Sequence, residues 1–274
     1  GFEYHHGLIE HMWKEIMKNH AHDSISCCCT DQVHKEIMAR FELAHDKADK
    51  LIEFYMRKIV DAMEDKEGMD KLGVFNLLSY ERTEVIETKI RLRGGSFSLY
   101  DKAGNKVDYY ITNKEEIDPG LIDRQIVHYG NYDPFYEYTI EFTAKDIPAV
   151  GYDTYFIKYN TGEHGEVNNT ESKETIENKF YKINANANGT INILDKKSNR
   201  EYKNLLLLEE GSDDGDEYDY SPLEEDFIIT NEAVKANVKY DFTPYLETID
   251  INYSLDIPKD LDSRKKKIKD SEMK

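Results

Sequence analysis

The sequence predicts an α+β fold in which a helical-bundle segment is followed by a β-sandwich region. Up to about residue 63, apolar residues recur every three or four positions, the period of a helix buried along one side. Beyond residue 72 they alternate with polar residues, as in half-buried strands. The 20 tyrosines support the strand prediction, because a half-polar ring suits a half-buried pleated surface.

Two helices are expected at the start of the chain. A short apolar stripe over 9–16 contains Trp13, the only tryptophan, which we expect to pack in the core. A longer stripe over 33–63 follows Thr30, whose side chain suits the N-cap of a helix. The simplest packing is antiparallel, and stripes of this width need further apolar partners, as in a bundle.

Strands are expected along most of the remaining chain. The segments with strand patterns are 88–92, 97–99, 107–111, 138–142, 152–159, 180–183, 191–194, 205–208, 234–240 and 247–255. Asn188-Gly189 predicts a tight hairpin turn, and the polar segment 161–176 predicts a linker. The charged run 263–274 shows no packing pattern.

Composition argues against several classes of protein. The formal net charge of -19 disfavours nucleic-acid binding, because the phosphate backbone would be repelled. No apolar run approaches the roughly 18 residues of a membrane span, and the start is unlike a signal peptide, so we expect a soluble cytoplasmic protein. The adjacent Cys27, Cys28 and Cys29 cannot build a disulfide framework, which fits a reducing compartment. Because consecutive thiols diverge, we expect buried free cysteines rather than a metal site.

Two segments could carry chemistry. Residues 19–24, where the first helical stripe ends, contain His20 and His22. Their spacing alone leaves open a metal ligand and a capping or hydrogen-bonded histidine. We expect His20 and His34 at helix ends or on the surface. The acidic run 209–219 lacks the glutamate spacing of an EF-hand, so a solvated loop is expected.

Residues 13–25 resemble the active-site segment of the family-38 glycoside hydrolases, in particular the bacterial branch that includes mannosylglycerate hydrolases. Further segments resemble the same branch in the same order, so that the resemblance covers nearly the whole chain; they are 31–41, 74–82, 147–152, 177–181, 188–190 and 211–222. The resemblance implies three parts. Residues 1–70 would be the end of the catalytic region plus the helical middle domain, 71–160 a β-rich domain, and 177–274 the start of a large C-terminal β-sandwich.

The resemblance also implies a function. The parent protein would be a zinc-dependent retaining glycoside hydrolase that cleaves α-mannosidic bonds, of the α-mannosidase or mannosylglycerate hydrolase type. His22 would be a zinc ligand, Asp23 would contact sugar hydroxyls, and Tyr218 would face the active-site cleft. A retaining glycosidase needs two carboxyl groups about 5 Å apart. The resemblance places both, and the other zinc ligands, upstream of Gly1, so this chain would contain no catalytic residue and would be inactive alone.

The resemblance also bears on partners and on an alternative function. The partner of the parent protein would be a carbohydrate containing α-linked mannose, and a homo-oligomer is possible. A second hypothesis is a non-catalytic carbohydrate-binding or scaffolding module. The chain departs from the family where it has Ser26-Cys27 in place of a usual glycine, and cysteine lacks the freedom of glycine at positive φ.

Overall fold

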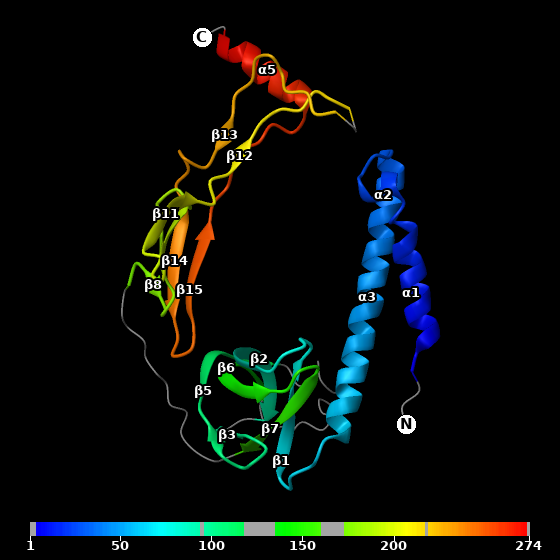
Figure 1. The fold of residues 1–274 in the computed structure, drawn as a ribbon, viewed down its shortest axis with the longest axis vertical. Helices are drawn as coiled ribbons and strands as arrows, with labels where there is room; N and C mark the ends of the chain where they lie inside the picture. Colours follow the sequence, from blue (N-terminus) through cyan, green and yellow to red (C-terminus); the bar gives the residue numbers. More distant parts are fainter. Residues whose placement is uncertain (1–3, 94–95, 118–134, 160–172, 217–218, 273–274) are drawn as a thin grey trace.

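The computed structural model describes residues 4–93, 96–117, 135–159, 173–216 and 219–272. A pair of helices, a first β unit and a second β region that ends in a helix follow one another along an open arc (Figure 1). The strand pairs of the described part are antiparallel. The α+β class predicted from the sequence is therefore confirmed. Within the described residues, no helix is both long enough and apolar enough to cross a membrane.

The helical part is an antiparallel hairpin. Helix α1 spans His6–Lys18, the short α2 spans His22–Ile25, and α3 spans Asp31–Ala62, starting directly after Thr30 as predicted. The start of α1 lies near the far end of α3, where the backbone N–H of His5 donates to the hydroxyl of Tyr55 at 2.8 Å. The end of α1 lies beside the beginning of α3, so the two helices run in opposite directions along each other (Figure 1).

The prediction that Trp13 packs in the core is wrong, because 55% of this residue is exposed. Two helices can cover only one stripe of each other, and here α1 buries no residue while α3 buries Ile37 and Ala44. Large apolar side chains are exposed on the hairpin; they are Leu8, Trp13, Met17, Val33, Met38, Leu43, Ile52, Phe54 and Met56. The apolar stripes of α1 and α3 are thus wider than the face that each helix covers on the other, as in a helix of a larger bundle.

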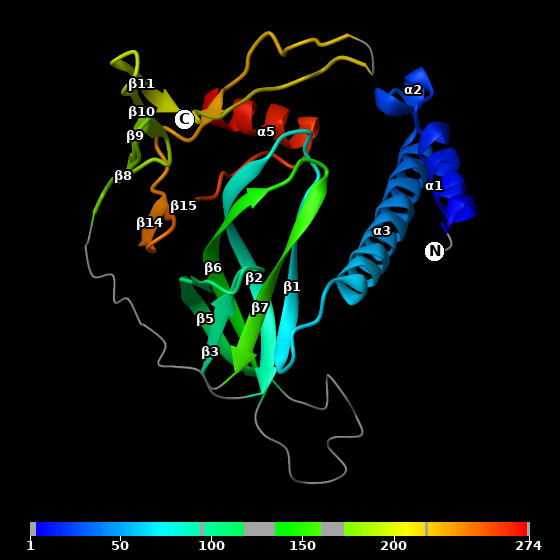
Figure 2. The same cartoon turned by 60° about the horizontal axis from the view of Figure 1, so that its bottom comes forward.

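The described residues of the first β unit form seven strands. They are β1 Met69–Asn76, β2 Arg82–Arg93, β3 Phe97–Tyr100, β4 Lys106–Val107, β5 Tyr109–Ile117, β6 Phe135–Ile147 and β7 Gly151–Tyr159. They form one sheet of order β1-β7-β3-β4 and another of order β2-β6-β5 (Figure 2). Both sheets contribute to one apolar core, in which Tyr138, Ile140 and Phe142 of β6 are fully buried. The predicted alternation over 138–142 therefore marks the central strand of a small sandwich.

The second β region contains shorter strands and a final helix. They are β8 Ile176–Glu177, β9 Tyr181–Ala185, β10 Ile191–Asp195, β11 Arg200–Leu205, β12 Glu209–Glu210, β13 Ile229–Thr230, β14 Asn237–Phe242, β15 Glu247–Asn252 and α5 Leu261–Glu272. The sheets have the orders β11-β10-β9-β8, β14-β15 and β12-β13. The hairpin turn predicted at Asn188-Gly189 is confirmed, because it connects β9 to β10 and Gly189 has a φ of 84°.

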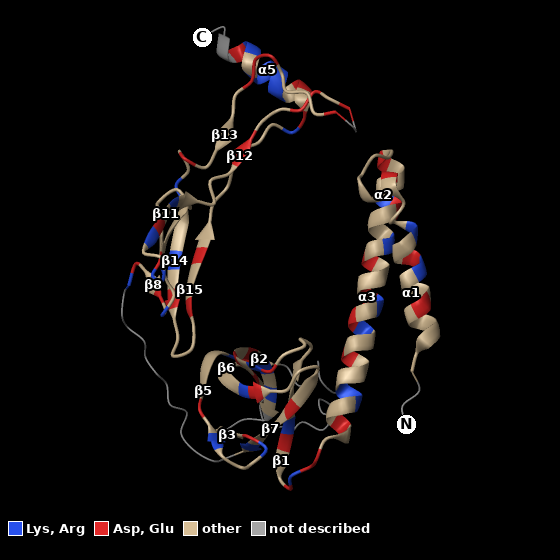
Figure 3. Cartoon of the chain, viewed as in Figure 1, with Lys and Arg blue, Asp and Glu red and all other residues tan. Residues whose placement is uncertain are grey.

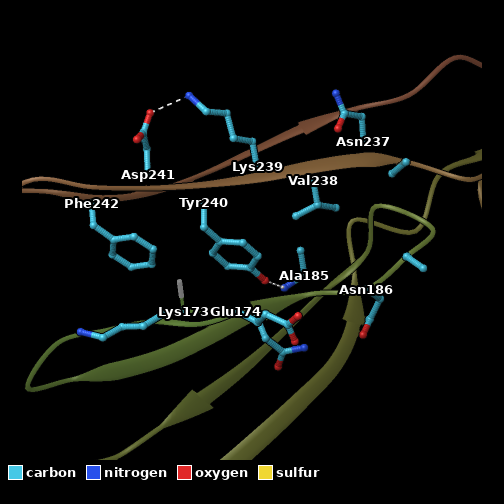
Figure 4. A pocket seen from close by; sticks show the side chains of 13 residues that line it. Lys173, Glu174, Ala185, Asn186, Asn237, Val238, Lys239, Tyr240, Asp241 and Phe242 are labelled. Atoms are coloured by element: carbon cyan, nitrogen blue, oxygen red, sulfur yellow. Dashed lines mark hydrogen bonds and ion pairs between the residues drawn. The ribbon is translucent and has the colours of Figure 1, made fainter. Parts of the chain in front are cut away.

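A cavity of about 920 Å³ lies between β14 and the end of β9. Val238, Tyr240 and Phe242 point from β14 toward β9, while Lys239 and Asp241 point away and pair with each other (Figure 4). The hydroxyl of Tyr240 accepts the backbone N–H of Ala185 at 2.9 Å. Alternation along β14 therefore divides the strand into an inner, mainly apolar face and an outer charged face.

Two predictions for this region need correction. Of the strand predicted over 205–208, only Leu205 lies in a strand, because Leu206 has a φ of 66°, which does not fit an extended strand. The charged run 263–274, for which no packing was predicted, lies largely in α5, and Arg264 of this helix is only 3% exposed. Its partners Glu210 and Asp226 are distant in sequence, so no local pattern could indicate them.

The helical hairpin joins the first β unit at the end of α3. Gly73 of β1 lies so close to α3 that a Cβ atom there would be 2.7 Å from the side chain of Val60. In the connection, the ammonium group of Lys66 lies 4.3 Å from the ring centroid of Phe156. The close backbone approach and the cation–π contact fix the end of the long helix against the sheet.

The second β region joins the first through the turn between β14 and β15. The hydroxyl of Thr243 donates to the carboxylate of Glu141 on β6, a residue that is 3% exposed. The hydroxyl of Tyr245 donates to the backbone carbonyl of Asp108 at 2.8 Å. This contact between the two β parts is therefore polar, unlike the apolar core within the first one.

We predict that Gly189→Ala destabilises the second β region by about 2 kcal/mol or more, because it combines backbone strain at positive φ with a clash. The added Cβ would lie 2.8 Å from the ring of Tyr253. Gly104→Ala is the control, since Gly104 has a φ of 89° and nothing lies within 4 Å of its Cβ position. Strain alone should cost about 1 kcal/mol there. Urea unfolding followed by circular dichroism measures both, and equal losses would contradict the proposed clash.

Candidate functional site

The candidate site lies at the end of the helical hairpin that is remote from the first β unit, around α2 (Figure 1). Helix α1 ends at Lys18, and the chain makes one turn through residues 19–21 before α2 starts at His22. Ala21 is extended, with φ -54° and ψ 138°, and no side chain caps α2. His22 therefore does not have the capping role that its spacing left open.

Asn19 holds this turn in place. It is 0% exposed, its amide donates to the backbone carbonyl of Ile37 at 2.9 Å, and its amide oxygen accepts a hydrogen bond from Arg40 at 3.2 Å. Both partners are on α3, so a single buried side chain ties the end of α1 to the second helix. This role could not be predicted from the sequence, because an asparagine after a helix resembles a simple C-cap and its partners are 18 and 21 positions away.

His22 and Asp23 are on the surface beside this anchor. The side chain of His22 is 95% exposed, and its Nε2 lies 3.0 Å from Oδ1 of Asp23, whose side chain is 56% exposed. His20 and His34 are exposed, as predicted. Within the described part of the chain, no group of three or more metal-binding side chains comes together. His22 and Asp23 could thus supply part of a metal or sugar site but do not form a complete one.

Tyr218 is the third residue predicted for the site. Tyr218 lies outside the described residues, so its predicted contact with substrate stays a prediction. The described residues of the acidic run 209–219 are mostly exposed, in agreement with a solvated loop. A cavity of about 630 Å³ next to Tyr245 and the large cavity beside β14 both lie in the β parts, and neither is lined by His22 or Asp23.

The cysteine loop terminates α2 in a Schellman motif. The N–H of Cys28 donates to the carbonyl of Asp23 at 2.9 Å, the N–H of Cys27 donates to the carbonyl of Ser24 at 3.2 Å, and Cys27 has a φ of 61°. Glycine is the usual residue at this left-handed position. Cys27, which stands where the family usually has glycine, is therefore the residue whose backbone has positive φ. The hydrogen bond from Cys28 also fixes the backbone carbonyl of Asp23.

The prediction of buried cysteines is wrong, because Cys27 is exposed and Cys28 and Cys29 are partly exposed. The turn that ends α2 turns these residues toward the surface instead of into the hairpin. Partial burial, assisted by the neighbouring thiols and by Asp23 and Asp31, raises the pKa of the Cys29 thiol. This thiol is therefore kept in its protonated, less nucleophilic form.

Known proteins with similar sequences and folds indicate a family relationship. Residues 1–59 match the family described as alpha mannosidase middle domain. A relative from Halalkalibacterium halodurans, named "Putative mannosylglycerate hydrolase", is 27% identical over 290 residues, covering 96% of this chain and 32% of the relative. Residues 1–59 are thus similar to the alpha mannosidase middle domain, and the chain as a whole is similar to proteins of glycoside hydrolase family 38.

Solved structures agree on the fold. An alpha-mannosidase from Enterococcus faecalis V583 matches with a TM-score of 0.71 and 24% identity, over 92% of this chain and 31% of that one. A glycosyl hydrolase family 38 protein from Enterococcus faecalis matches with a TM-score of 0.72 and 24% identity, over 92% of this chain and 32% of that one. The chain thus spans about a third of the length of the relatives it matches.

We predict that Asn19→Ala destabilises the helical hairpin by about 1–3 kcal/mol, because a buried amide and both of its hydrogen bonds are lost. His20→Ala is the matched neighbour, since His20 is exposed, and should change stability by less than about 0.5 kcal/mol. Urea unfolding of the helical circular-dichroism signal gives both values. Similar effects of the two substitutions would contradict the anchoring role of Asn19.

We predict that Cys27→Gly stabilises the α2 turn by about 0.5–1 kcal/mol, because relief of left-handed strain exceeds the extra entropy of glycine in the unfolded chain. Cys28→Gly is the control, because Cys28 is not among the described residues with positive φ and gains no such relief. It should be neutral or destabilising. The comparison uses urea midpoints under reducing conditions, and a loss of stability in Cys27→Gly would refute the strain argument.

Proposed function

We propose that the protein to which this chain contributes is a zinc-dependent retaining glycoside hydrolase that cleaves α-mannosidic bonds. The observation that carries the proposal is the match of residues 1–59 to an alpha mannosidase middle domain, with His22 and Asp23 exposed at the tip of that hairpin. The names of the relatives, an alpha-mannosidase and a putative mannosylglycerate hydrolase, indicate the substrate class. A carbohydrate with an α-linked mannosyl group is therefore the proposed substrate.

In this proposal His22 supplies one neutral imidazole to a shared zinc site, and the remaining ligands come from outside these 274 residues. The exposed imidazole, held on a turn that Asn19 anchors, suits a ligand that meets another part of the protein. Zinc would hold vicinal sugar hydroxyls and stabilise charge. Asp23, beside His22, is an acceptor for the hydroxyls of a mannosyl ring. The hydrogen bond from Cys28 to the carbonyl of Asp23 keeps the backbone that carries this acceptor in place.

The two carboxyl groups that attack and protonate the glycosidic bond are proposed to come from outside this chain. Retention requires them about 5 Å apart. The exposed apolar flanks of the helical hairpin support this division, since surfaces of this kind are normally covered in a stable protein. The 274-residue chain alone should accordingly have no mannosidase activity, and a remaining portion of the protein should cover the hairpin.

We expect His22→Ala in the complete protein to lower zinc affinity by about 10–100-fold or more, the scale known even for losses around a ligand. Melting temperature should change little, because the side chain is exposed. Hydrolysis of an aryl α-mannoside should fall in parallel and recover partly at high zinc. The measurements are zinc per mole, melting temperature and rate as a function of zinc concentration.

His20→Ala is the control for this experiment and should keep its zinc and activity. Loss of zinc in His20→Ala but not in His22→Ala would mean that the wrong histidine has been assigned. If neither variant loses zinc, the metal proposal fails. A complete protein that binds mannosides without hydrolysing them would favour the alternative of a carbohydrate-binding module.

A further inference from the structure

The acidic loop, defined as residues 211–226, joins β12 to β13 and contains no lysine or arginine. Its carboxylates lie at positions 213, 214, 216, 217, 219, 224, 225 and 226. Like charges at this density repel one another and favour an expanded loop. Cations that keep the loop compact must therefore come from another segment. Figure 3 shows lysine and arginine along α5, the helix that lies beside the base of this loop.

Arg264 of α5 is the buried cation at the base of the loop. Its side chain is 4% exposed, Nη1 lies 2.8 and 2.9 Å from the two carboxylate oxygens of Glu210, and Nε lies 2.6 Å from Oδ1 of Asp226. The guanidinium also donates to the carbonyl of Phe227 and lies 4.6 Å from its ring centroid. Glu210 directly precedes the loop and Asp226 is its last residue, so one guanidinium joins the two ends.

The charge state of Asp226 supports this arrangement. Burial would raise the pKa of its carboxyl, but hydrogen bonds from Arg264 and from Ser212 outweigh burial and hold the pKa well below its usual range. The stabilisation by this ion pair is complete above the ordinary aspartate pKa. It is lost only as the pH falls through the lowered pKa of Asp226 in the folded protein. The pair is therefore intact throughout the neutral range.

Hydrogen bonds continue from the base into the loop and connect its two limbs. The N–H of Ser212 donates to Asp226 at 2.7 Å, and the hydroxyl of Ser212 accepts the N–H of Leu223 at 3.1 Å. Further out, the carboxylate of Asp213 accepts the N–H of Ser221 at 3.0 Å. Because each limb is bonded to the other, the direction of the described loop residues, 211–216 and 219–226, depends on the geometry at the base.

That direction is toward α2. In both ribbon views the connection between β12 and β13 extends from α5 across the open side of the arc toward the end of the helical hairpin, where His22 and Asp23 lie (Figures 1 and 2). No other described segment of the second β region extends toward α2 in this way. Arg264 contacts Glu210, Asp226 and Phe227, so an effect of Arg264 on α2 would pass through the loop.

We propose that Arg264 is a positioning residue that sets the approach of the acidic loop to the His22–Asp23 end of the hairpin and thereby contributes to substrate binding. The inference rests on the proposed hydrolase function for its substrate part and on the structure for the loop itself. Arg264 acts by joining Glu210 to Asp226, and it does not touch the substrate. Lysine cannot replace it fully, because an ammonium group lacks the fork geometry that pairs with both carboxylates.

The test compares Arg264→Met with Lys266→Met in the complete protein. Lys266 is an exposed residue of the same helix, so the control removes the same charge without disturbing the base of the loop. Hydrogen–deuterium exchange of peptides covering 211–226 should become about tenfold faster or more in Arg264→Met, because several charge-assisted hydrogen bonds are lost. It should not change in Lys266→Met. Asp226→Asn, which keeps the side-chain shape, should act in the same direction if Arg264→Met fails to fold.

The second readout is kinetic. In Arg264→Met the KM for an aryl α-mannoside should rise about 5–10-fold while kcat changes less than about twofold, since ground-state and transition-state binding are weakened together. Arg264→Lys should recover part of the KM. Unchanged exchange of the loop, or faster exchange with an unchanged KM, would overturn the proposal. If the unaltered protein hydrolyses no α-mannoside, the proposed function and the substrate part fail together, and the exchange experiment alone decides whether Arg264 holds the loop.

Discussion

Burial of apolar side chains between the two small sheets of the first β unit is the interaction on which the other described parts depend. Tyr138, Ile140 and Phe142 on one face of β6 are fully buried, and this fixes the strand against the facing sheet. The opposite face of the same strand presents Glu141, which accepts the hydrogen bond from Thr243 of the second β region. One strand thus forms the core and also supplies the contact for its neighbour.

The first β unit also determines the position of the helical hairpin. Gly73 of β1 leaves no room for a side chain beneath Val60 of α3, and this close packing sets where the end of the long helix meets the sheet. From there α3 continues for its 32 residues toward α2. The position of His22 therefore depends on two contacts, the packing at Gly73 and the hydrogen bonds of Asn19, at opposite ends of one helix.

Regular periods were sufficient to predict the two long helices of the hairpin and most strands of the first β unit, and the Asn188-Gly189 dipeptide predicted its turn, because these depend on residues close in sequence. The strand β1 and the helix α5 were not predicted. Exposure was harder to predict. Trp13 belongs to an apolar stripe, but whether it is buried depends on a neighbour that two helices cannot provide. Asn19 and Arg264 could not be recognised for a related reason, since the partners of Arg264 are 38 and 54 positions away. Of the site, His22 and Asp23 were indicated by resemblance, and only the structure revealed the anchor behind them.

Arg264 has a consequence for how this sequence can change during evolution. A buried guanidinium that faces two carboxylates is costly to separate from either one, because the remaining charge would be left without its counter-ion. Substitutions at 210, 226 and 264 should therefore be accepted mainly as a set, through coordinated replacement. The exposed lysines of α5 are free of this restriction and can drift one at a time. The few residues at the base of the acidic loop would thus diverge slowly, while the surface around them changes quickly.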